Sequence, residues 1–159
     1  MNEILKLLER DAELEPAEIA ECLGRDEAEV REILERCKRE GIIMGRAALI
    51  DWNKVQDERV TALIEVKIAP QRGEGFDRIA RRIYQYDEVE SLTLMSGAYD
   101  LAVTIQGKSL QAVAGFVAQN LATIDGVTGT ATHFVLKRYK EKHKIYGAEP
   151  QQEERVRFV

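Results

Sequence analysis

The chain is poor in the residues that build disulfide frameworks, and it contains no long apolar run. Its two cysteines, Cys22 and Cys37, are too few for a disulfide scaffold or a cysteine-based zinc site, which favours a reduced, cytoplasmic protein. No stretch of about 18 uncharged apolar residues occurs, which excludes a transmembrane helix and a membrane partner. Residues 1–6 lack the basic-then-apolar order of a signal peptide, in agreement with a cytoplasmic location.

Groups that carry out catalysis are also scarce. The only two histidines, His133 and His143, lie far from any thiol or carboxylate pattern that would indicate a metal. The chain has no Ser/His/Asp set and no Gly-x-Gly-x-x-Gly phosphate loop, and Gly73-Glu74-Gly75 is better explained as a break between a strand and a helix. We therefore expect no catalytic residue, no metal and no cofactor.

Charge is distributed unevenly along the chain. Charged residues make up 32% and hydrophobic residues 45%, which is typical of a globular protein, and the net charge is −5. Residues 1–58 hold 9 Lys and Arg against 16 Asp and Glu, a net charge of −7, whereas residues 59–159 hold 14 against 12, a net charge of +2. Phosphate contacts supply most non-specific affinity for DNA, so DNA binding by residues 1–58 must overcome the repulsion between their net negative charge and the phosphates.

Three short amphipathic helices are predicted at the start of the chain. Pro16 suits the first turn of the second helix, and Gly24 ends that helix. Asp26 is the expected N-cap of the third helix, with Glu29 as its capping-box partner. The tight Gly24-Arg25 turn between the two helices indicates a helix-turn-helix. The apolar positions at helical spacing are Ile4, Leu5, Leu7 and Leu8, then Ile19, Ala20 and Leu23, then Val30, Ile33, Leu34 and Cys37.

The segment after Gly41 contains two short apolar runs. Residues 42–44 and 47–50 are expected to pair as a short ribbon, which would be the wing of a winged helix-turn-helix. Residues 52–59 are polar enough to be a connector. The expected domains are therefore a winged helix-turn-helix at 1–51, the connector at 52–59, a second domain at 60–140 and a C-terminal tail at 141–159.

The second domain shows alternating strand and helix patterns. Its order, β-α-β-β-α-β, is the split βαβ arrangement of a ferredoxin-like domain, so the fold class is α+β. Pro70, Gly73 and Gly75 close the first strand. The predicted elements are a strand at 60–69, a helix at 76–84, strands at 89–94 and 101–105, a helix at 110–121 and a strand at 127–139.

A glycine loop, Ser96-Gly97-Ala98-Tyr99-Asp100, separates the two central strands. Gly97 has no Cβ and tolerates positive φ, so backbone amides there can approach a carboxylate closely, while Asp100 can hold an ammonium. The loop therefore suits a free amino acid. Alternatives remain open: Gly97 as a plain hairpin glycine, Tyr99 as a core or interface ring, and Asp100 as a cap of the turn.

Two further patterns have both a structural and a functional interpretation. Thr128, Thr130 and Thr132 alternate along the last strand and share one face, either as simple β-formers or as hydroxyl donors. The basic run at 137–144 is either a solvated strand end or a nucleic-acid contact.

These features together resemble the Lrp/AsnC family of leucine-responsive, "feast or famine" transcription regulators. The resemblance extends to about residue 142 and is most specific at the Gly-x-Tyr-Asp loop, Gly97 to Asp100, followed by a Gly-Val…Thr-x-Thr strand that runs from Gly126 to Lys137. It implies a RAM-type C-terminal domain that dimerises through its sheets and builds higher oligomers. It also implies an amino-acid effector bound at a subunit interface. There the Ser96–Tyr99 backbone would bind the carboxylate of the effector, and Asp100 would bind its amine. Thr130 and Thr132 would offer hydroxyls to the effector or to the partner subunit.

The third helix departs from the family pattern. Glu32 and Ile33 occupy the positions where the family commonly has Arg-Arg, and residues 26–40 hold four basic and six acidic side chains, a net charge of −2. Carboxylates stabilise the first turn through the helix dipole but repel phosphate, although glutamate can accept a hydrogen bond from cytosine N4. We therefore expect weak, salt-sensitive DNA binding that depends on assembly. The expected DNA-contacting residues are Arg25, Glu27, Arg31, Glu32 and Arg46.

Two functions of different classes remain open. The first is an amino-acid-responsive transcription regulator that binds double-stranded DNA as a homo-oligomer. The second is an amino-acid-sensing or protein-interaction module whose helix-turn-helix has lost DNA binding, an alternative motivated by the acidic third helix. An enzyme is disfavoured because no catalytic set is found.

Overall fold

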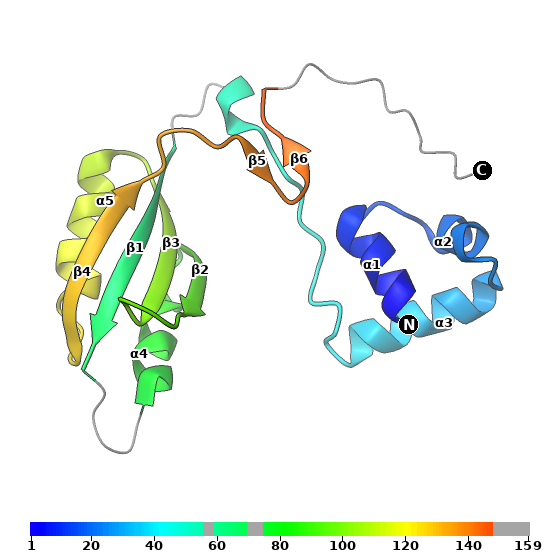
Figure 1. The fold of residues 1–159 in the computed structure, drawn as a ribbon, viewed down its shortest axis with the longest axis horizontal. Helices are drawn as coiled ribbons and strands as arrows, with labels where there is room; N and C mark the ends of the chain where they lie inside the picture. The colour runs from blue at the N-terminus through cyan, green and yellow to red at the C-terminus, as the bar shows by residue number, and fades with distance from the viewer. Residues whose placement is uncertain (56–58, 70–74, 148–159) are drawn as a thin grey trace. The chain divides into compact units, whose positions relative to one another are not determined.

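The structure is a computed structural model that describes residues 1–55, 59–69 and 75–147. The chain divides into two compact units (Figure 1). The first consists of residues 1–50 together with the described residues 139–147, and the second of residues 51–138. Predictions that fall on residues 56–58, on Pro70 and Gly73, and on the tail from 148 lie outside the described residues.

The first unit is built on three helices: α1 (Asn2–Arg10), α2 (Pro16–Leu23) and α3 (Glu27–Arg39). These are the three helices that the apolar spacing predicts. They meet around a small core of aliphatic side chains, to which each helix contributes. Its buried members are Ile4, Ile19, Ala20, Val30 and Leu34.

The turn between α2 and α3 has the expected chemistry. Gly24 adopts the left-handed conformation, with φ 60° and ψ 38°, and ends α2. The Asp26 carboxylate accepts hydrogen bonds from the backbone N–H groups of Ala28 and Glu29 and so caps α3. The Glu29 side chain, predicted to complete a capping box with Asp26, instead bonds to Arg25. The cap therefore depends on Asp26.

We expect Asp26→Ala to destabilise the first unit by about 1 kcal/mol, because two backbone N–H groups at the start of α3 lose their acceptor. Asp26→Asn keeps an acceptor and is expected to remain near wild type. Urea unfolding of the full chain, followed by helical circular dichroism, measures both variants. Equal stability of Asp26→Ala and wild type would contradict the capping role.

The expected ribbon at 42–50 does not form; this prediction is wrong. Residues 42–50 contain no strand, and the N–H groups of Ile42 and Ile43 both donate to the Cys37 carbonyl, at 2.9 and 3.1 Å. These bonds close the end of α3 after Gly41, which has φ 69°. An isolated two-stranded ribbon is marginally stable in water, so the apolar runs alone are insufficient to form one.

The second unit is an antiparallel sheet with the strand order β2-β3-β1-β4. Helices α4 (Gly75–Ile83) and α5 (Leu110–Phe116) cover one face of it (Figure 1). Every second residue of β1 is buried against these helices, as strand periodicity requires. The predicted β-α-β-β-α-β order is confirmed. The strands are β1 (Val60–Ile68), β2 (Val89–Leu94), β3 (Leu101–Gly107) and β4 (Val127–Phe134).

Two predicted elements differ from the expectation near their ends. The helix predicted to reach residue 121 is α-helical to Phe116 and continues as a π-helical turn, η2 (Val117–Leu121). The last strand stops at Phe134, opposite Ala62, instead of at residue 139, although the next N–H, of Val135, still donates to the Thr61 carbonyl at 2.9 Å. The chain then forms a small hairpin of β5 (Lys140–Glu141) and β6 (Lys144–Ile145), which takes up part of the predicted basic run.

The described part of the connector contains one short 3₁₀ helix, η1 (Trp52–Lys54), capped by the Asp51 carboxylate. The Arg59 guanidinium lies over the Trp52 ring, 3.9 Å from its centroid. Within the described residues, no helix has the length and apolarity needed to cross a membrane.

Candidate DNA-binding and effector sites

Arg25, in the turn between α2 and α3, is engaged inside the first unit. Its Nη2 lies 3.2 Å from Glu3 Oε2 on α1, and its Nη1 lies 3.3 Å from Glu29 Oε1 on α3. Only 31% of the side chain is exposed. Its guanidinium therefore links α1 to α3, which restricts its availability to a DNA phosphate.

The α3 side chains expected to reach DNA are exposed, and one cation among them is already paired. The Arg31 guanidinium bonds to the Glu27 carboxylate one turn earlier in the helix. Glu32 is exposed and forms no ion pair within the described part of the chain. α3 is the second helix of the helix-turn-helix, and in proteins of this kind the second helix enters the major groove.

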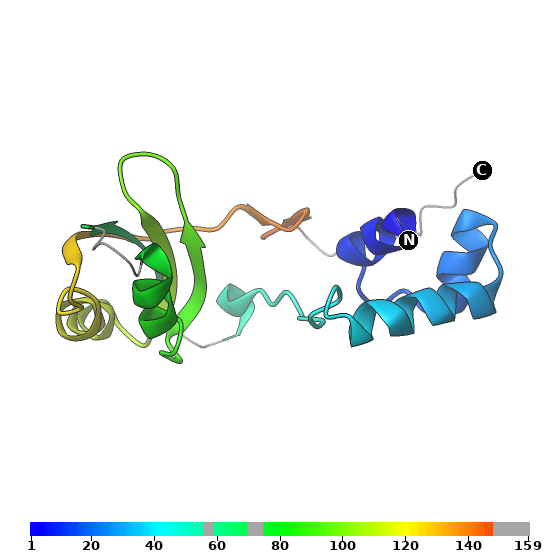
Figure 2. The same cartoon turned by 90° about the horizontal axis from the view of Figure 1, so that it is seen from below.

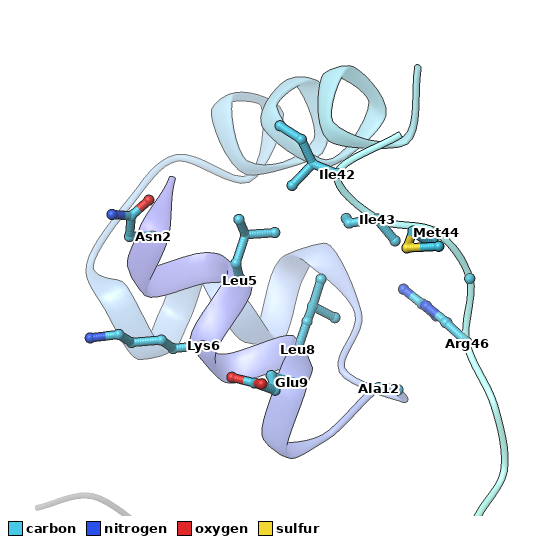
Figure 3. Close-up of a pocket in the computed structure, with 11 residues that line it drawn as sticks. Asn2, Leu5, Lys6, Leu8, Glu9, Ala12, Ile42, Ile43, Met44 and Arg46 are labelled. Atoms are coloured by element: carbon cyan, nitrogen blue, oxygen red, sulfur yellow. The ribbon is translucent and has the colours of Figure 1, made fainter. Parts of the chain in front are cut away.

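Arg46 lies beside two pockets, each of about 560 Å³. The first is lined by α1 and by the residues that follow α3, including Leu5, Leu8 and Met44 (Figure 3). The second lies between the start of α2, one side of α3 and residues 43–46, and it brings Arg46 and Arg31 to one surface. The other three predicted DNA-contacting residues, Arg25, Glu27 and Glu32, do not line this second pocket.

Lys38 also lines the second pocket and was missed by the sequence analysis. Its Nζ lies 2.7 Å from Glu35 Oε1. The spacing of Arg31, Glu35 and Lys38 places all three on one side of the helix. From the sequence, this spacing could have shown that Lys38 lies on the same side as Arg31. The hydrogen bond and the positive charge of the Lys38 ammonium hold the pKa of the Glu35 carboxyl below its usual value.

The second candidate site is the loop between β2 and β3. Figure 2 shows that this loop extends well beyond the sheet. The Met95 N–H donates to the Asp100 carbonyl at 2.8 Å and closes its base, while Ser96, Gly97 and Ala98 are exposed at its tip. Gly97 has φ 142°, a conformation that a side chain disfavours. The loop thus presents backbone to its surroundings, and Tyr99 is half-buried.

Asp100 fixes the loop to the neighbouring strand β1. Its N–H donates to the Val66 carbonyl at 3.0 Å, and its Oδ2 accepts the Ile68 N–H at 2.7 Å. The bond from the Ile68 N–H to the Asp100 carboxylate corresponds to the alternative interpretation of Asp100 as a cap, although the capped N–H is 32 residues away in sequence. A carboxylate has further lone pairs, so one anchored oxygen leaves Oδ1 able to accept from a ligand.

The register places the threonines of β4 beside the same part of β1. Thr130 lies opposite Val66 and Thr132 opposite Ile64, on the helix-covered face. The register shifts between Lys67 and Ile68, and Thr128, which falls at this bulge, donates its hydroxyl to the Lys67 carbonyl at 3.2 Å. Thr130 and Thr132 therefore share a face as predicted, whereas Thr128 is occupied at the bulge.

One chain brings these residues near each other without enclosing them. Thr130, Val66 and Leu101 lie in one row across three strands, so Thr130 is about 10 Å from the base of the loop. A pocket of about 420 Å³ lies between α4 and β2, close to the Ser96–Asp100 loop. Its lining includes Leu94 and Leu101, which flank the loop, but none of Ser96–Asp100. A second surface is needed to close a site over the loop.

The fold and these sites define a helix-turn-helix protein joined to a ferredoxin-like α+β domain. Comparison with known families agrees: the Lrp/AsnC ligand-binding domain matches residues 61–145, and a winged helix-turn-helix DNA-binding domain matches residues 2–44. The chain belongs to the Lrp/AsnC family, and it is a transcription regulator of that type, with a DNA-binding helix-turn-helix and a ligand-binding domain.

Individual relatives support this assignment. The chain is 46% identical to the HTH-type transcriptional regulator YugG of Bacillus subtilis over 91% of this chain and 88% of that protein. A regulator of Neisseria meningitidis solved with L-methionine is 24% identical, with a TM-score of 0.70 over 87% of this chain and 89% of that one. A feast or famine regulatory protein of Mycobacterium tuberculosis, also complexed with L-methionine, is 20% identical, with a TM-score of 0.72 over 90% and 94%. At these identities the two solved structures show a shared fold.

Proposed function

We propose that this regulator responds to a free amino acid held between two copies of the chain at the Ser96–Asp100 loop. The observation that carries the proposal is the closed, glycine-containing loop, which exposes backbone at Ser96–Ala98 and ends at the partly buried Asp100. Two structural neighbours are complexes with L-methionine, which supports an amino acid as the ligand class. Backbone amides at Ser96, Gly97, Ala98 and Tyr99 would hold the carboxylate, and Asp100 Oδ1 would hold the ammonium.

The second copy supplies the other wall of this site. Thr130 and Thr132, on the edge strand β4, offer hydroxyls to the effector or to the partner subunit. A ligand that binds one assembly better than another shifts the population toward that assembly. The resulting change in spacing between helix-turn-helix pairs alters their fit to operator half-sites. We place this dimer-based regulator in the cytoplasm.

DNA binding in the proposed function is weak and salt-sensitive. The contacts come from Arg31 and Glu32 on α3 and from Arg46. Arg25 is held by Glu3 and Glu29, and Arg31 must exchange its partner Glu27 for a phosphate. The acidic α3 also favours a second candidate, an interaction module that has lost DNA binding. In that case replacement of Glu27 and Glu32 by alanine leaves DNA occupancy unchanged, whereas a DNA-binding α3 changes its affinity when two phosphate-repelling charges are removed.

The effector is tested by a thermal-shift screen of the chain against the common amino acids. A ligand at about a hundred times its Kd adds about 2.7 kcal/mol to the stability of the form that binds it, a shift of several degrees in Tm. We expect one or a few amino acids to give such a shift and to change the oligomer size in sedimentation. If no amino acid moves Tm and the oligomer never changes, the sensing part of the proposal is wrong.

A further inference from the structure

The groove between α2, α3 and residues 43–46 concentrates cations. Its volume is about 560 Å³, and its lining includes Arg31, Lys38 and Arg46. Two carboxylates, Glu15 and Glu35, line it as well. The remaining lining is largely apolar or backbone, so a ligand in this groove meets three positive side chains from two segments of the first unit.

The position of this groove suits a strand of DNA backbone. In a helix-turn-helix, the second helix enters the major groove while the first helix crosses the backbone. The groove lies between those two helices, beside the start of α2 at Pro16. The Glu15 carboxylate accepts a hydrogen bond from the backbone N–H of Glu18 at the start of α2, so this N–H is not available to a phosphate. The attraction for a phosphate must therefore come from the cationic side chains.

Two of the three cations are occupied by carboxylates of the same helix. Glu35 bonds to Lys38 at 2.7 Å, and Glu27 bonds to Arg31. Arg46 forms no ion pair among the described residues. All four paired side chains are about half exposed, and exposed ion pairs are weak and screened by salt. A DNA phosphate can therefore displace the carboxylates, but it must compete with them.

We propose that this groove is a binding site for a DNA backbone phosphate, and that Glu27 and Glu35 act as internal competitors that hold Arg31 and Lys38 until DNA displaces them. The inference rests on the proposed DNA-binding function and explains how an acidic recognition helix still binds DNA. The competition lowers the affinity for DNA, but the same ion pairs keep Arg31 and Lys38 in position to receive a phosphate. Lys38 is a phosphate contact in this account.

The test compares charge-matched variants for binding to a labelled duplex of the region upstream of the gene. Glu35→Gln frees Lys38, and the control Glu40→Gln removes one negative charge from the end of the same helix without touching the groove. We expect Glu35→Gln to bind roughly 3- to 10-fold more tightly than Glu40→Gln at low salt. We expect its plot of log K against log salt to keep the slope of Glu40→Gln, because the Lys38 ammonium reaches a phosphate in both complexes. Glu27→Gln is expected to act in the same direction through Arg31.

Lys38→Met completes the cycle. It is expected to weaken DNA binding, and Glu35→Gln in the Lys38→Met background should give no gain beyond that of Glu40→Gln. Circular dichroism and Tm confirm that every variant is folded. Equal affinities of Glu35→Gln and Glu40→Gln, with DNA still bound, would overturn the competition while leaving the DNA-binding function intact. If no folded variant binds DNA even at low salt, the proposed DNA binding fails and this inference fails with it.

Discussion

Asp100→Ala is expected to abolish amino-acid binding and to destabilise the second unit by about 1.5–3 kcal/mol. The Ile68 N–H would lose a charged acceptor at 2.7 Å, and hydrogen bonds to charged groups contribute about that much. Because the same bond anchors the loop to β1, Ser96–Tyr99 would also lose their position. Isothermal titration with the amino acid found by thermal shift, together with urea unfolding, measures both effects.

Asp100→Asn separates the two roles of this residue. An asparagine keeps a carbonyl acceptor for Ile68 but has no negative charge, so stability should remain close to wild type. Affinity for the amino acid is expected to fall about tenfold or more, since an ammonium loses its charge partner. Wild-type affinity in Asp100→Asn would show that the carboxylate is only a cap and that the ammonium is bound elsewhere.

The largest effect on DNA binding is expected from the double variant Arg31→Ala/Arg46→Ala. Each arginine lines the groove beside α3, and each substitution should weaken binding to every duplex sequence and flatten the salt dependence by about one unit. The combined loss is expected to be on the order of 50-fold at low salt, and larger in an oligomer in which several helix-turn-helix units act together. Fluorescence anisotropy over a salt series measures affinity and slope.

Arg25→Ala is the matched control for that experiment. Arg25 bridges Glu3 and Glu29, so we expect its loss to lower the Tm of the first unit slightly while the salt slope stays at the wild-type value. A reduced slope with an unchanged Tm would place Arg25 on a phosphate and contradict its bridging role.

Local sequence signals predicted the elements of this fold well. Pro16, Gly24 and Asp26 act within one turn of the helices that they start or end, so their roles follow from the residues alone. The strands follow from the alternation of buried residues, as in β1. Errors arose where an element depends on pairing: residues 42–50 form no strand, and β4 stops pairing with β1 after Phe134.

The residues of the candidate sites could be picked out from the sequence, whereas the long-range bonds that they make could not. The Gly97 loop is recognisable from sequence, whereas the bond from Ile68 to Asp100 joins the end of β1 to the loop before β3 and requires the β1–β3 register. The position of Arg25 between α1 and α3 likewise follows from helix packing, as one of its partners, Glu3, is 22 residues away. Lys38 lies about two helical turns after Arg31, outside the part of α3 where the sequence predicted DNA contacts, and its place beside Arg46 follows only from the fold.

The central claim is that an amino acid bound at the Ser96–Asp100 loop changes DNA binding by the helix-turn-helix. The most direct measurement is anisotropy of a labelled upstream duplex, titrated with the full chain at low and moderate salt, with and without that amino acid. We predict binding at low salt that weakens as salt rises, and an affinity that the amino acid changes in wild type but not in Asp100→Asn. A folded oligomer that fails to bind DNA at low salt, or whose affinity is the same with and without the amino acid, would contradict the account.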